Sequence, residues 1–465
     1  MGKPPKPKPV PAFGRDEKIY FFKFALILIG VYFFYDPVYK YWQYLAIILP
    51  VIFIFYVWYM MIQTGEGMVD VLKQYFTFIP IPRAEGGEKL FIPKATILLV
   101  LLNIFVFYLM KALPDAANEF IIEHLAFLPH AHAWWNILLS PFTSMFIHSN
   151  AGHLWGNMVF LWAFAPGIEE RIGRKKFLML YLLTGLLGKF TAVVIKDLFL
   201  GKMHTSIGAS GAISGIMGIF MVRCYFKKLI IPIPLLGLVN GKVRINSLLL
   251  LGLYFLLNME SGLRVLAGGQ TRVAYWVHLG SLVSGVVLAI ILKMHRNAAE
   301  EKYTLDGLAG VEDQVYGIDG TGQLQKALAL NPDNEAALLA MARVKARRRL
   351  LQGRNLYEKS VALTLRSDPD KAAQIYDEYF RVYKRMLSPD LEYRIAGLLH
   401  SRGDKKKAIR SLEMVVDEPS TRDGTRFKAF HQLIPMLSEI GRHDKAKIRQ
   451  QQFVECFPKK ISEKQ

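Results

Sequence analysis

The stretch FIHSNAGHLWGNMVFLWAFAPGIEERIG, residues 146–173, joins an apolar segment to polar side chains that membrane segments rarely carry. His148, His153 and Asn157 stand near the start of its apolar part, Leu154–Ile168. His153 and Asn157 are four residues apart, so both lie on one face of the helix that such a run predicts. Because polar groups inside a span are costly, the stretch indicates a membrane protein with a functional site at one end of this span.

The whole chain divides at about Met294 into an apolar part and a polar part. Of its 465 residues 52% are hydrophobic and the formal charge is +20, a combination that soluble domains do not show. No nucleic-acid-binding motif accompanies the charge, so we expect contact with anionic lipid and no nucleic-acid partner. Cys224 and Cys456 differ too much in position and context to indicate a disulfide or a metal site.

Apolar segments predict eight membrane spans, because about 20 apolar residues cross a hydrocarbon core of about 30 Å. The predicted spans are Ile19–Tyr35, Tyr41–Ile62, Ala95–Met110, Leu154–Ile168, Phe177–Ile195, Ala209–Tyr225, Ser247–Leu257 and Val273–Leu292. The first two form a helical hairpin, whose role as a gate, a substrate contact or an anchor stays open. The predicted fold class is all-α: a transmembrane hairpin, a six-helix membrane core and a soluble helical repeat domain.

Lysine and arginine in the loops predict the orientation of the spans. The stretch Ala112–Glu170 contains neither residue, so we expect the loop after the third span to lie outside the cell. Three later segments are basic, and we expect them inside the cell. Arg171, Arg174, Lys175 and Lys176 follow the fourth span, Arg223, Lys227, Lys228, Lys242 and Arg244 follow the sixth, and Lys293 and Arg296 follow the last. No small-residue cleavage site follows the first span, which predicts an uncleaved anchor. We expect a multi-pass protein of the inner cell membrane with both termini in the cytoplasm.

The polar part begins with a predicted linker and continues with repeated helices. Turns followed by helices recur at intervals of roughly 34 residues, at 370–373, 403–408 and 441–446, each with a small residue (Ala372, Ala408, Ala446) facing its partner helix. These units resemble tetratricopeptide repeats, which implies a concave peptide-binding face and a cytoplasmic protein partner. A generic helical hairpin domain is the alternative. The predicted domains are a basic cytoplasmic tail (1–18), the hairpin (19–62), a cytoplasmic or interfacial connector (63–94), the membrane core (95–294), the linker (295–322) and the repeats (323–465).

Two further polar clusters lie in predicted spans. Gly208-Ala209-Ser210-Gly211 opens the sixth span, and His278 stands in the last. A serine hydroxyl becomes a nucleophile when a base accepts its proton, and neutral imidazole suits that task. Gly208 and Gly211 leave room for a substrate backbone, and the helix end offers N–H groups to a developing oxyanion.

His153 and Asn157 are expected to help surround that oxyanion. No acid within the spans completes a triad, since Glu260 lies at a loop edge, so the pattern favours a Ser210–His278 dyad. All three clusters lie at external ends of their spans, which predicts a site that opens to the outer, periplasmic side.

Each cluster alone has a plainer interpretation. Small residues in spans often serve helix packing, and a single intramembrane histidine is often a packing residue or a proton relay. The loop histidines His124, His130 and His132 lack the spacing of a metal site. Glu169 and Arg171 are expected to form a structural ion pair.

The order HxxxxHxxxN, GxSG and a histidine in the final span resembles the rhomboid family of intramembrane serine proteases. The resemblance covers about Ala95–Leu292, with further matches at Gly167–Gly173 and Gly285. It implies Ser210 as nucleophile and His278 as base, with no metal and no cofactor. It also implies that His153 and Asn157 bind the oxyanion, that His148 supports the cavity, and that the substrates are transmembrane proteins.

Three positions depart from the family pattern. Trp134-Trp135 replaces a Trp-Arg pair of many relatives, Ser214 stands where some carry an aromatic residue against the histidine, and Ser281 replaces a glycine. A non-catalytic rhomboid-like binder or chaperone is therefore the alternative function. A transporter with a proton relay would require polar groups through both faces, and an anchored repeat scaffold would require one span only.

Overall fold

The computed structural model describes residues 91–127, 134–200, 206–235, 239–268, 274–311, 319–347 and 351–458, with a few more between 55 and 65. The chain forms two compact units that divide at Ala299. The predicted tail and the span Ile19–Tyr35 lie outside the described residues, as do most of Tyr41–Ile62 and of the connector.

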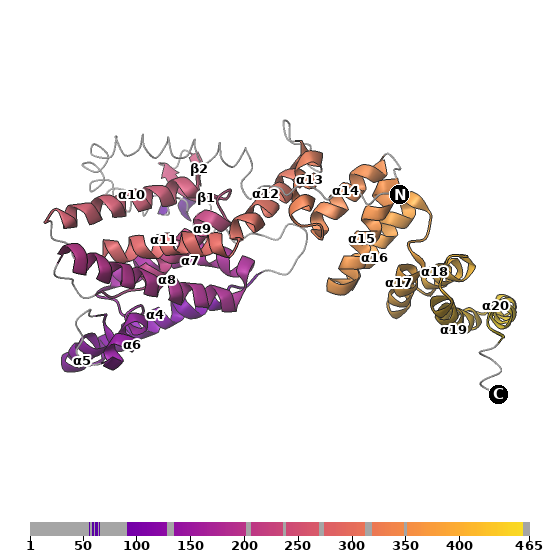
Figure 1. The fold of residues 1–465 in the computed structure, drawn as a ribbon, viewed down its shortest axis with the longest axis horizontal. Coiled ribbons are helices and arrows are strands. Elements are labelled where there is room, and N and C mark those ends of the chain that lie inside the picture. Colours follow the sequence, from indigo (N-terminus) through magenta and orange to yellow (C-terminus); the bar gives the residue numbers. More distant parts are fainter. Residues whose placement is uncertain are drawn as a thin grey trace. The chain divides into compact units, whose positions relative to one another are not determined.

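Each of the six predicted core spans is a helix, which confirms the helical, polytopic fold class. These helices are α4 (Lys94–Ala112), α7 (Ala151–Ile172), α8 (Arg174–Ile195, continued by the π-helical turn η1, Lys196–Leu200), α9 (Ser210–Arg223), α10 (Ser247–Leu266) and α11 (Tyr275–Ile291). Figure 1 shows α4, α8, α10 and α11 running in nearly the same direction. Within the described residues, α4, α8 with η1, and α10 are long and apolar enough to cross a membrane by themselves, and α11 taken with the helix after it would add a fourth span.

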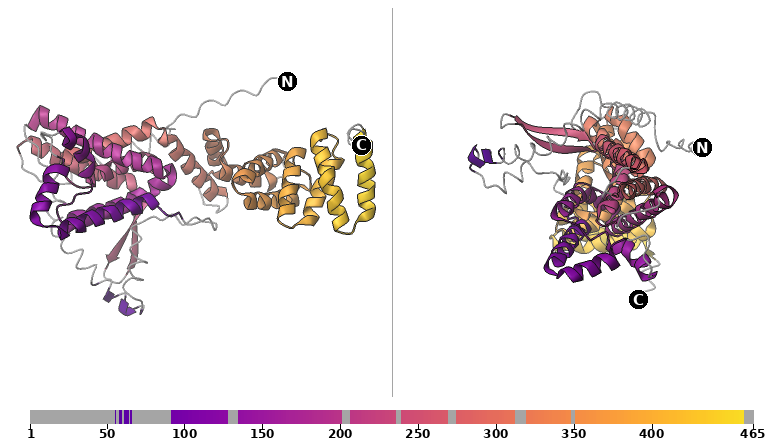
Figure 2. Two further views of the ribbon diagram at one scale, coloured as in Figure 1. Left: turned by 90° about the horizontal axis from the view of Figure 1, so that it is seen from below. Right: turned by 90° about the vertical axis from the view of Figure 1, so that its left-hand side faces the viewer.

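Two segments that were expected as loops have regular structure. The segment between α4 and α7 contains α5 (Asp115–Leu125) and α6 (Trp134–Thr143). Between α9 and α10, strands β1 (Lys228–Leu235) and β2 (Val239–Asn246) pair antiparallel, with Lys228 opposite Asn246 and Leu235 opposite Val239. The strands form a ribbon that projects from the helices of this unit (Figure 2). Period-two alternation is weak in this basic, proline-containing stretch, which explains why the sequence did not predict it.

Helix α9 is the centre of the membrane unit, and every residue from Gly211 to Phe220 is buried. Its contact with α11 is so close that backbones touch. A Cβ atom on Gly285 would lie 2.1 Å from the carbonyl oxygen of Gly215, and one on Gly218 would lie 2.1 Å from that of Leu282. Small residues allow this approach, which is the usual basis of helix association in membranes.

The buried carboxylate of Glu169 joins α7 to the start of α4. It accepts the backbone N–H groups of Ala95 and Thr96 at 2.9 and 2.8 Å, and the Thr96 hydroxyl at 2.8 Å. These are N–H groups that a helix leaves unpaired at its first turn. The expected ion pair of Glu169 with Arg171 is therefore wrong, and Arg171 contacts Glu170 at 3.3 Å.

The second unit consists of helices. They are α12 (Met294–Val311, which begins in the membrane unit), α13 (Gly320–Leu330), α14 (Glu335–Arg347), α15 (Leu351–Ser367), α16 (Pro369–Tyr383), α17 (Pro389–Ser401), α18 (Lys405–Asp417), α19 (Asp423–Glu439) and α20 (His443–Cys456). The described part of the predicted linker 295–322 is helical, because α12 covers most of it and α13 begins at Gly320. Gly307 lies close to Leu324 on α13, and Tyr303 is buried with it, so the glycines serve helix contact.

The helices from α14 onward pack against their neighbours in sequence and stand in a row (Figure 2). Asp368 and Asp404 cap α16 and α18 by accepting backbone N–H groups. Ala372, Ala408 and Ala446 are buried, as expected for the small residue of each pair. The described part of this unit is therefore helical, as predicted from the sequence.

Candidate active site

Ser210 is the first residue of α9, and the backbone before it is held in an unusual conformation. Gly208 has a φ of +106°, which favours glycine. A Cβ atom there would lie 2.7 Å from the His153 ring and 3.4 Å from the Asn157 amide nitrogen, so glycine alone brings the chain this close. The Gly208 N–H donates to the carbonyl oxygen of Ser144 at 2.8 Å. These contacts place the His153 ring and the Asn157 amide of α7 beside the chain that leads into Ser210.

Ser210 faces His278 across the α9–α11 contact. The His278 Nε2 atom lies 2.8 Å from the Ser210 Oγ atom, which is hydrogen-bond distance. The first bond within α9 runs from the Ile213 N–H to the Ala209 carbonyl, so the N–H groups before Ile213 have no partner within the helix. The arrangement can move a proton from a hydroxyl to an imidazole beside a set of N–H donors.

Gly211 has a different role from the one expected. A Cβ atom on Gly211 would lie 2.8 Å from Val277 and 3.5 Å from the Ser281 hydroxyl, both on α11. The residue is buried, so its missing side chain serves helix packing and not the approach of a substrate. Ser281 stands where some relatives carry glycine, and its side chain fits because Gly188 on α8 faces it. A Cβ atom on Gly188 would overlap the Ser281 hydroxyl.

His148, His153 and Asn157 form a second polar group at the start of α7. The Asn157 side-chain amide donates to the His148 Nε2 atom at 3.0 Å, and the His148 Nδ1–H donates to the Phe146 carbonyl at 3.3 Å. Nε2 is therefore the acceptor of a neutral ring. Asn150 caps α7 by accepting the His153 N–H at 2.9 Å. The rings of His148 and His153 meet edge to face at 5.1 Å.

Helix α10 contributes side chains to the far side of His278. The Asn258 Oδ1 atom lies 3.0 Å from the His278 Nδ1 atom. The Tyr254 ring lies beside the His278 ring, with 6.5 Å between centroids, and its hydroxyl is 2.8 Å from that of Ser214. Ser214 also donates to the Ser210 carbonyl at 2.8 Å. An aromatic residue thus lies against the histidine, but it comes from α10 and not from position 214.

The wall behind Gly208 contains a buried lysine. Lys189 on α8 is 3% exposed and donates to the Ser144 hydroxyl, and its ammonium lies 5.2 Å above the Phe127 ring. Phe127 in turn pairs with Ser206 through two backbone hydrogen bonds of 3.3 and 3.1 Å. The lysine therefore joins Phe127 and Ser144 to the chain before Ser210.

Asn258 and Lys189 were missed by the sequence analysis, although both carried a signal. Each is a polar residue in an apolar helix, the feature that singled out the other clusters. Lys189 lies inside the predicted span Phe177–Ile195. Asn258 follows the predicted span Ser247–Leu257 directly, and α10 in fact continues to Leu266, so the early boundary excluded it.

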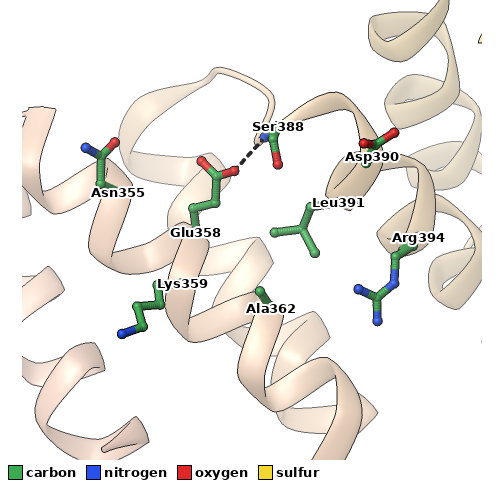
Figure 3. Close-up of a pocket in the computed structure, with 8 residues that line it drawn as sticks. All are labelled: Asn355, Glu358, Lys359, Ala362, Ser388, Asp390, Leu391 and Arg394. Carbon is green, nitrogen blue, oxygen red and sulfur yellow. Dashed lines mark hydrogen bonds between the residues drawn. The ribbon is translucent and has the colours of Figure 1, made fainter. Parts of the chain in front are cut away.

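A separate cavity of about 440 Å³ lies in the helical unit, between α15 and the start of α17 (Figure 3). Its lining is Asn355, Glu358, Lys359, Ala362, Ser388, Asp390, Leu391 and Arg394. Figure 3 shows Leu391 and Ala362 facing the same space, with charged side chains around them. The backbone N–H of Ser388 donates to Glu358 at 3.2 Å.

The geometry defines a polytopic helical membrane protein whose core holds a serine against a histidine. Residues 131–295 match the family of the Rhomboid domain. Over 115 residues the chain is 29% identical to the putative rhomboid protease YdcA of Bacillus subtilis (strain 168), which covers 25% of this chain and 51% of that protein. Over 245 residues it is 24% identical to the rhomboid protease GluP of the same organism. This match covers 51% of this chain and 43% of that protein.

A third relative is the mitochondrial presenilin-associated rhomboid-like protein of Bos taurus, 31% identical over 116 residues, which cover 25% of this chain and 29% of that protein. The chain thus spans about half or less of the length of these relatives. Together the matches support the rhomboid family for the membrane core. The matched residues 131–295 contain both the serine and the histidine.

Proposed function

We propose that this protein is an intramembrane serine endopeptidase that hydrolyses peptide bonds in or near the transmembrane segments of membrane proteins. The observation that carries the proposal is the hydrogen bond of 2.8 Å between the Ser210 hydroxyl and the His278 Nε2 atom. Serine hydrolases on unrelated folds share this pairing. The matches to rhomboid proteases support the same chemistry.

In the proposed reaction the Ser210 hydroxyl attacks the scissile carbonyl while His278 Nε2 accepts its proton. The oxyanion that forms is bound by the N–H groups at the start of α9 and by His153 and Asn157, with His148 holding Asn157 in place. The imidazolium then protonates the leaving amine, and a water molecule hydrolyses the acyl-enzyme. No step uses a metal or a cofactor.

The test is cleavage of a model transmembrane substrate by purified protein in liposomes, with Ser210→Ala as the comparison. We expect native protein to cleave and to label at Ser210 with a fluorophosphonate or isocoumarin probe, and the variant to lose both. Removal of the nucleophile lowers the rate of serine proteases by roughly 10⁶-fold. The absence of both cleavage and labelling in native protein, across several substrates with small-residue segments, would favour the non-catalytic rhomboid-like binder.

We also propose that the catalytic site opens to the periplasm and that the helical unit lies in the cytoplasm. The basic loops support this orientation. The measurement is labelling of single introduced cysteines in intact cells, one at Asn118 on α5 and one at Arg442 before α20. An impermeant reagent should label only the first position, and the reverse pattern would exclude the proposal.

The helical unit is proposed to recruit a protein partner or a substrate tail through the cavity between α15 and α17. Its lining of exposed charge around Leu391 supports peptide binding. In pulldowns with the full-length protein we expect Arg394→Glu, at the cavity, to lose a specifically enriched protein that Arg442→Glu retains. Equal enrichment by both variants would exclude this surface.

A further inference from the structure

Asn258 is a buried polar residue in the otherwise apolar helix α10, and it is 7% exposed. An amide in such a helix is costly unless its hydrogen bonds are made. Both ends of this amide have partners. The Nδ2 atom lies 2.8 Å from the Tyr254 carbonyl oxygen, and the Oδ1 atom lies 3.0 Å from the His278 Nδ1 atom.

The Tyr254 carbonyl determines which way the Asn258 amide points. A carbonyl oxygen only accepts hydrogen bonds, so the amide atom facing it must be the NH₂ group. The opposite orientation would place two oxygen atoms against each other. The Oδ1 atom, which also only accepts, therefore faces His278, and the His278 Nδ1 atom must carry a hydrogen.

This hydrogen determines the state of the other ring nitrogen. A neutral imidazole carries one hydrogen, so a hydrogen on Nδ1 leaves Nε2 with a free lone pair. The Nε2 atom is the one that lies 2.8 Å from the Ser210 hydroxyl. The chain of contacts from Tyr254 through Asn258 to His278 thus prepares the ring to accept the serine proton.

We propose that Asn258 is the positioning residue of the catalytic histidine, so that the Ser210–His278 dyad expected from the sequence is extended by an asparagine that holds the histidine ring. This inference rests on the proposed endopeptidase function. Asn258 does not touch the substrate. It fixes the tautomer and the angle of the His278 ring and accepts the Nδ1–H bond more strongly when the ring is charged. An amide oxygen accepts this hydrogen bond without placing a net charge in the membrane, where a carboxylate would be costly.

The experiment compares Asn258→Ala and Asn258→Asp with native protein in liposomes. Loss of an orienting aspartate lowers the rate of a serine protease by roughly 10⁴-fold, and we expect the uncharged Asn258 to account for about 10- to 100-fold in kcat with little change in KM. Asn258→Asp keeps the acceptor for His278. Its protonated carboxyl can donate to the Tyr254 carbonyl as the amide does, and once it ionises at alkaline pH it adds a charge that favours imidazolium. It should restore activity at alkaline pH and move the acid limb of the pH–rate profile to higher pH.

A matched control is available in Asn103 on α4. Its side-chain amide also donates to the carbonyl four residues earlier, at 2.7 Å, and it is also buried, but it contacts neither Ser210 nor His278 in the described hydrogen bonds. Asn103→Ala should leave kcat and the pH profile unchanged. The titratable groups near His278 are Tyr254 on α10 and His153 on α7, while Lys189 on α8 is bonded to Ser144; all are retained in these variants. A native kcat in Asn258→Ala, or an acid limb that Asn258→Asp does not move, would overturn the proposal.

A second measurement separates failure of this inference from failure of the proposed function. Full-length protein labelled with ¹⁵N-histidine in nanodiscs reports which ring nitrogen of His278 carries hydrogen, with His278→Gln assigning the signal. We expect hydrogen on Nδ1 in native protein and a mixture of both forms in Asn258→Ala. Hydrogen on Nε2 in native protein, or identical spectra for the two, would overturn the inference even if no substrate were cleaved.

Discussion

The two units of this protein both bury large side chains, but the membrane unit also contains a helix pair whose backbones touch. In the membrane unit, α9 and α11 meet in this way at Gly215, Gly218 and Gly285. Large aromatic side chains are fully buried in both units, Tyr181 and Phe164 in the membrane unit and Tyr376 and Phe430 in the helical unit. Lipid is as apolar as leucine, so close backbone contact is an important source of helix association in a membrane. In water, burial of large side chains is the main stabilising contribution.

Both units nevertheless treat a buried carboxylate in the same way. Glu169 in the membrane unit accepts hydrogen bonds from the first turn of α4, and Glu392 in the helical unit accepts them from Tyr376 and the Leu387 N–H. The comparison therefore teaches that the closeness of helix contact differs between the two units, whereas a buried carboxyl group is hydrogen-bonded in both.

The largest expected effect comes from adding one methyl group at the glycine contact. In Gly285→Ala the new Cβ atom would lie 2.1 Å from the Gly215 carbonyl oxygen, which no side-chain rotation relieves. We expect a loss of more than about 3 kcal/mol in the stability of the membrane unit, and loss of cleavage. Thermal unfolding in detergent followed by tryptophan fluorescence measures this, because all seven tryptophans precede Val277.

The control for this variant is Gly156→Ala on α7, where a Cβ atom would meet nothing within 4 Å. It should unfold at the native temperature or slightly above it. Equal destabilisation by both alanines would show that the close α9–α11 contact is not what holds the membrane unit together.

An intermediate effect is expected for the buried carboxyl of the helical unit. Burial raises the pKa of Glu392, against the opposing hydrogen bonds from Tyr376 and Leu387. A raised pKa in the folded state means that this group stabilises the fold below the ordinary pKa of a glutamate, and that the contribution is lost as pH rises. In Glu392→Gln the amide can donate to Tyr376, whose hydroxyl then donates to Ser411, 2.9 Å away.

We therefore expect Glu392→Gln to change stability by on the order of 1 kcal/mol, and to become more stable relative to native protein as pH rises from 4 to 8. Hydrogen exchange of α17 peptides in the full-length protein, compared at each pH, measures the difference. A difference that stays constant across this range, or that reverses, would show that Glu392 is ionised in both states.

The smallest effect is expected for a glycine of the helical unit. Gly397 lies inside α17, and a Cβ atom there would meet nothing within 4 Å. Gly397→Ala should stabilise the helical unit by about 0.5–1 kcal/mol, because alanine restricts the unfolded chain and favours helix. Hydrogen exchange of α17 should slow accordingly. Faster exchange would indicate that the glycine is required for packing in this unit too.

The sequence predicted the positions of the six core helices, because the lengths of apolar segments and the polar residues within them can be read directly from it. It also predicted that Ser210, His278, His153 and Asn157 share one site, since charge in the loops places their span ends at one depth. It did not predict β1 and β2, or the helix over 294–311, where glycine was taken as a sign of a loop.

Asn258 shows why part of the site was beyond sequence reasoning. Its role depends on the Tyr254 carbonyl and on His278, which lies on another helix. Composition shows that a residue is polar and inside a span, but not which atom it meets. An amide oxygen can accept the Nδ1–H bond of a histidine as a carboxylate does, so the lack of an acid in the spans did not exclude a third residue.

The length of α9 bears on the substrates of the proposed endopeptidase. With 14 residues, its axis is about 21 Å long, whereas the hydrocarbon layer is about 30 Å thick. A helix that is about 9 Å shorter than this layer cannot have both ends at its surfaces, and Ser210 is its first residue. Under the proposed function, a peptide bond that meets Ser210 within the layer also has to present a carbonyl that is not engaged in its own helix. Segments that unwind easily would then be cut, and stable helices would not.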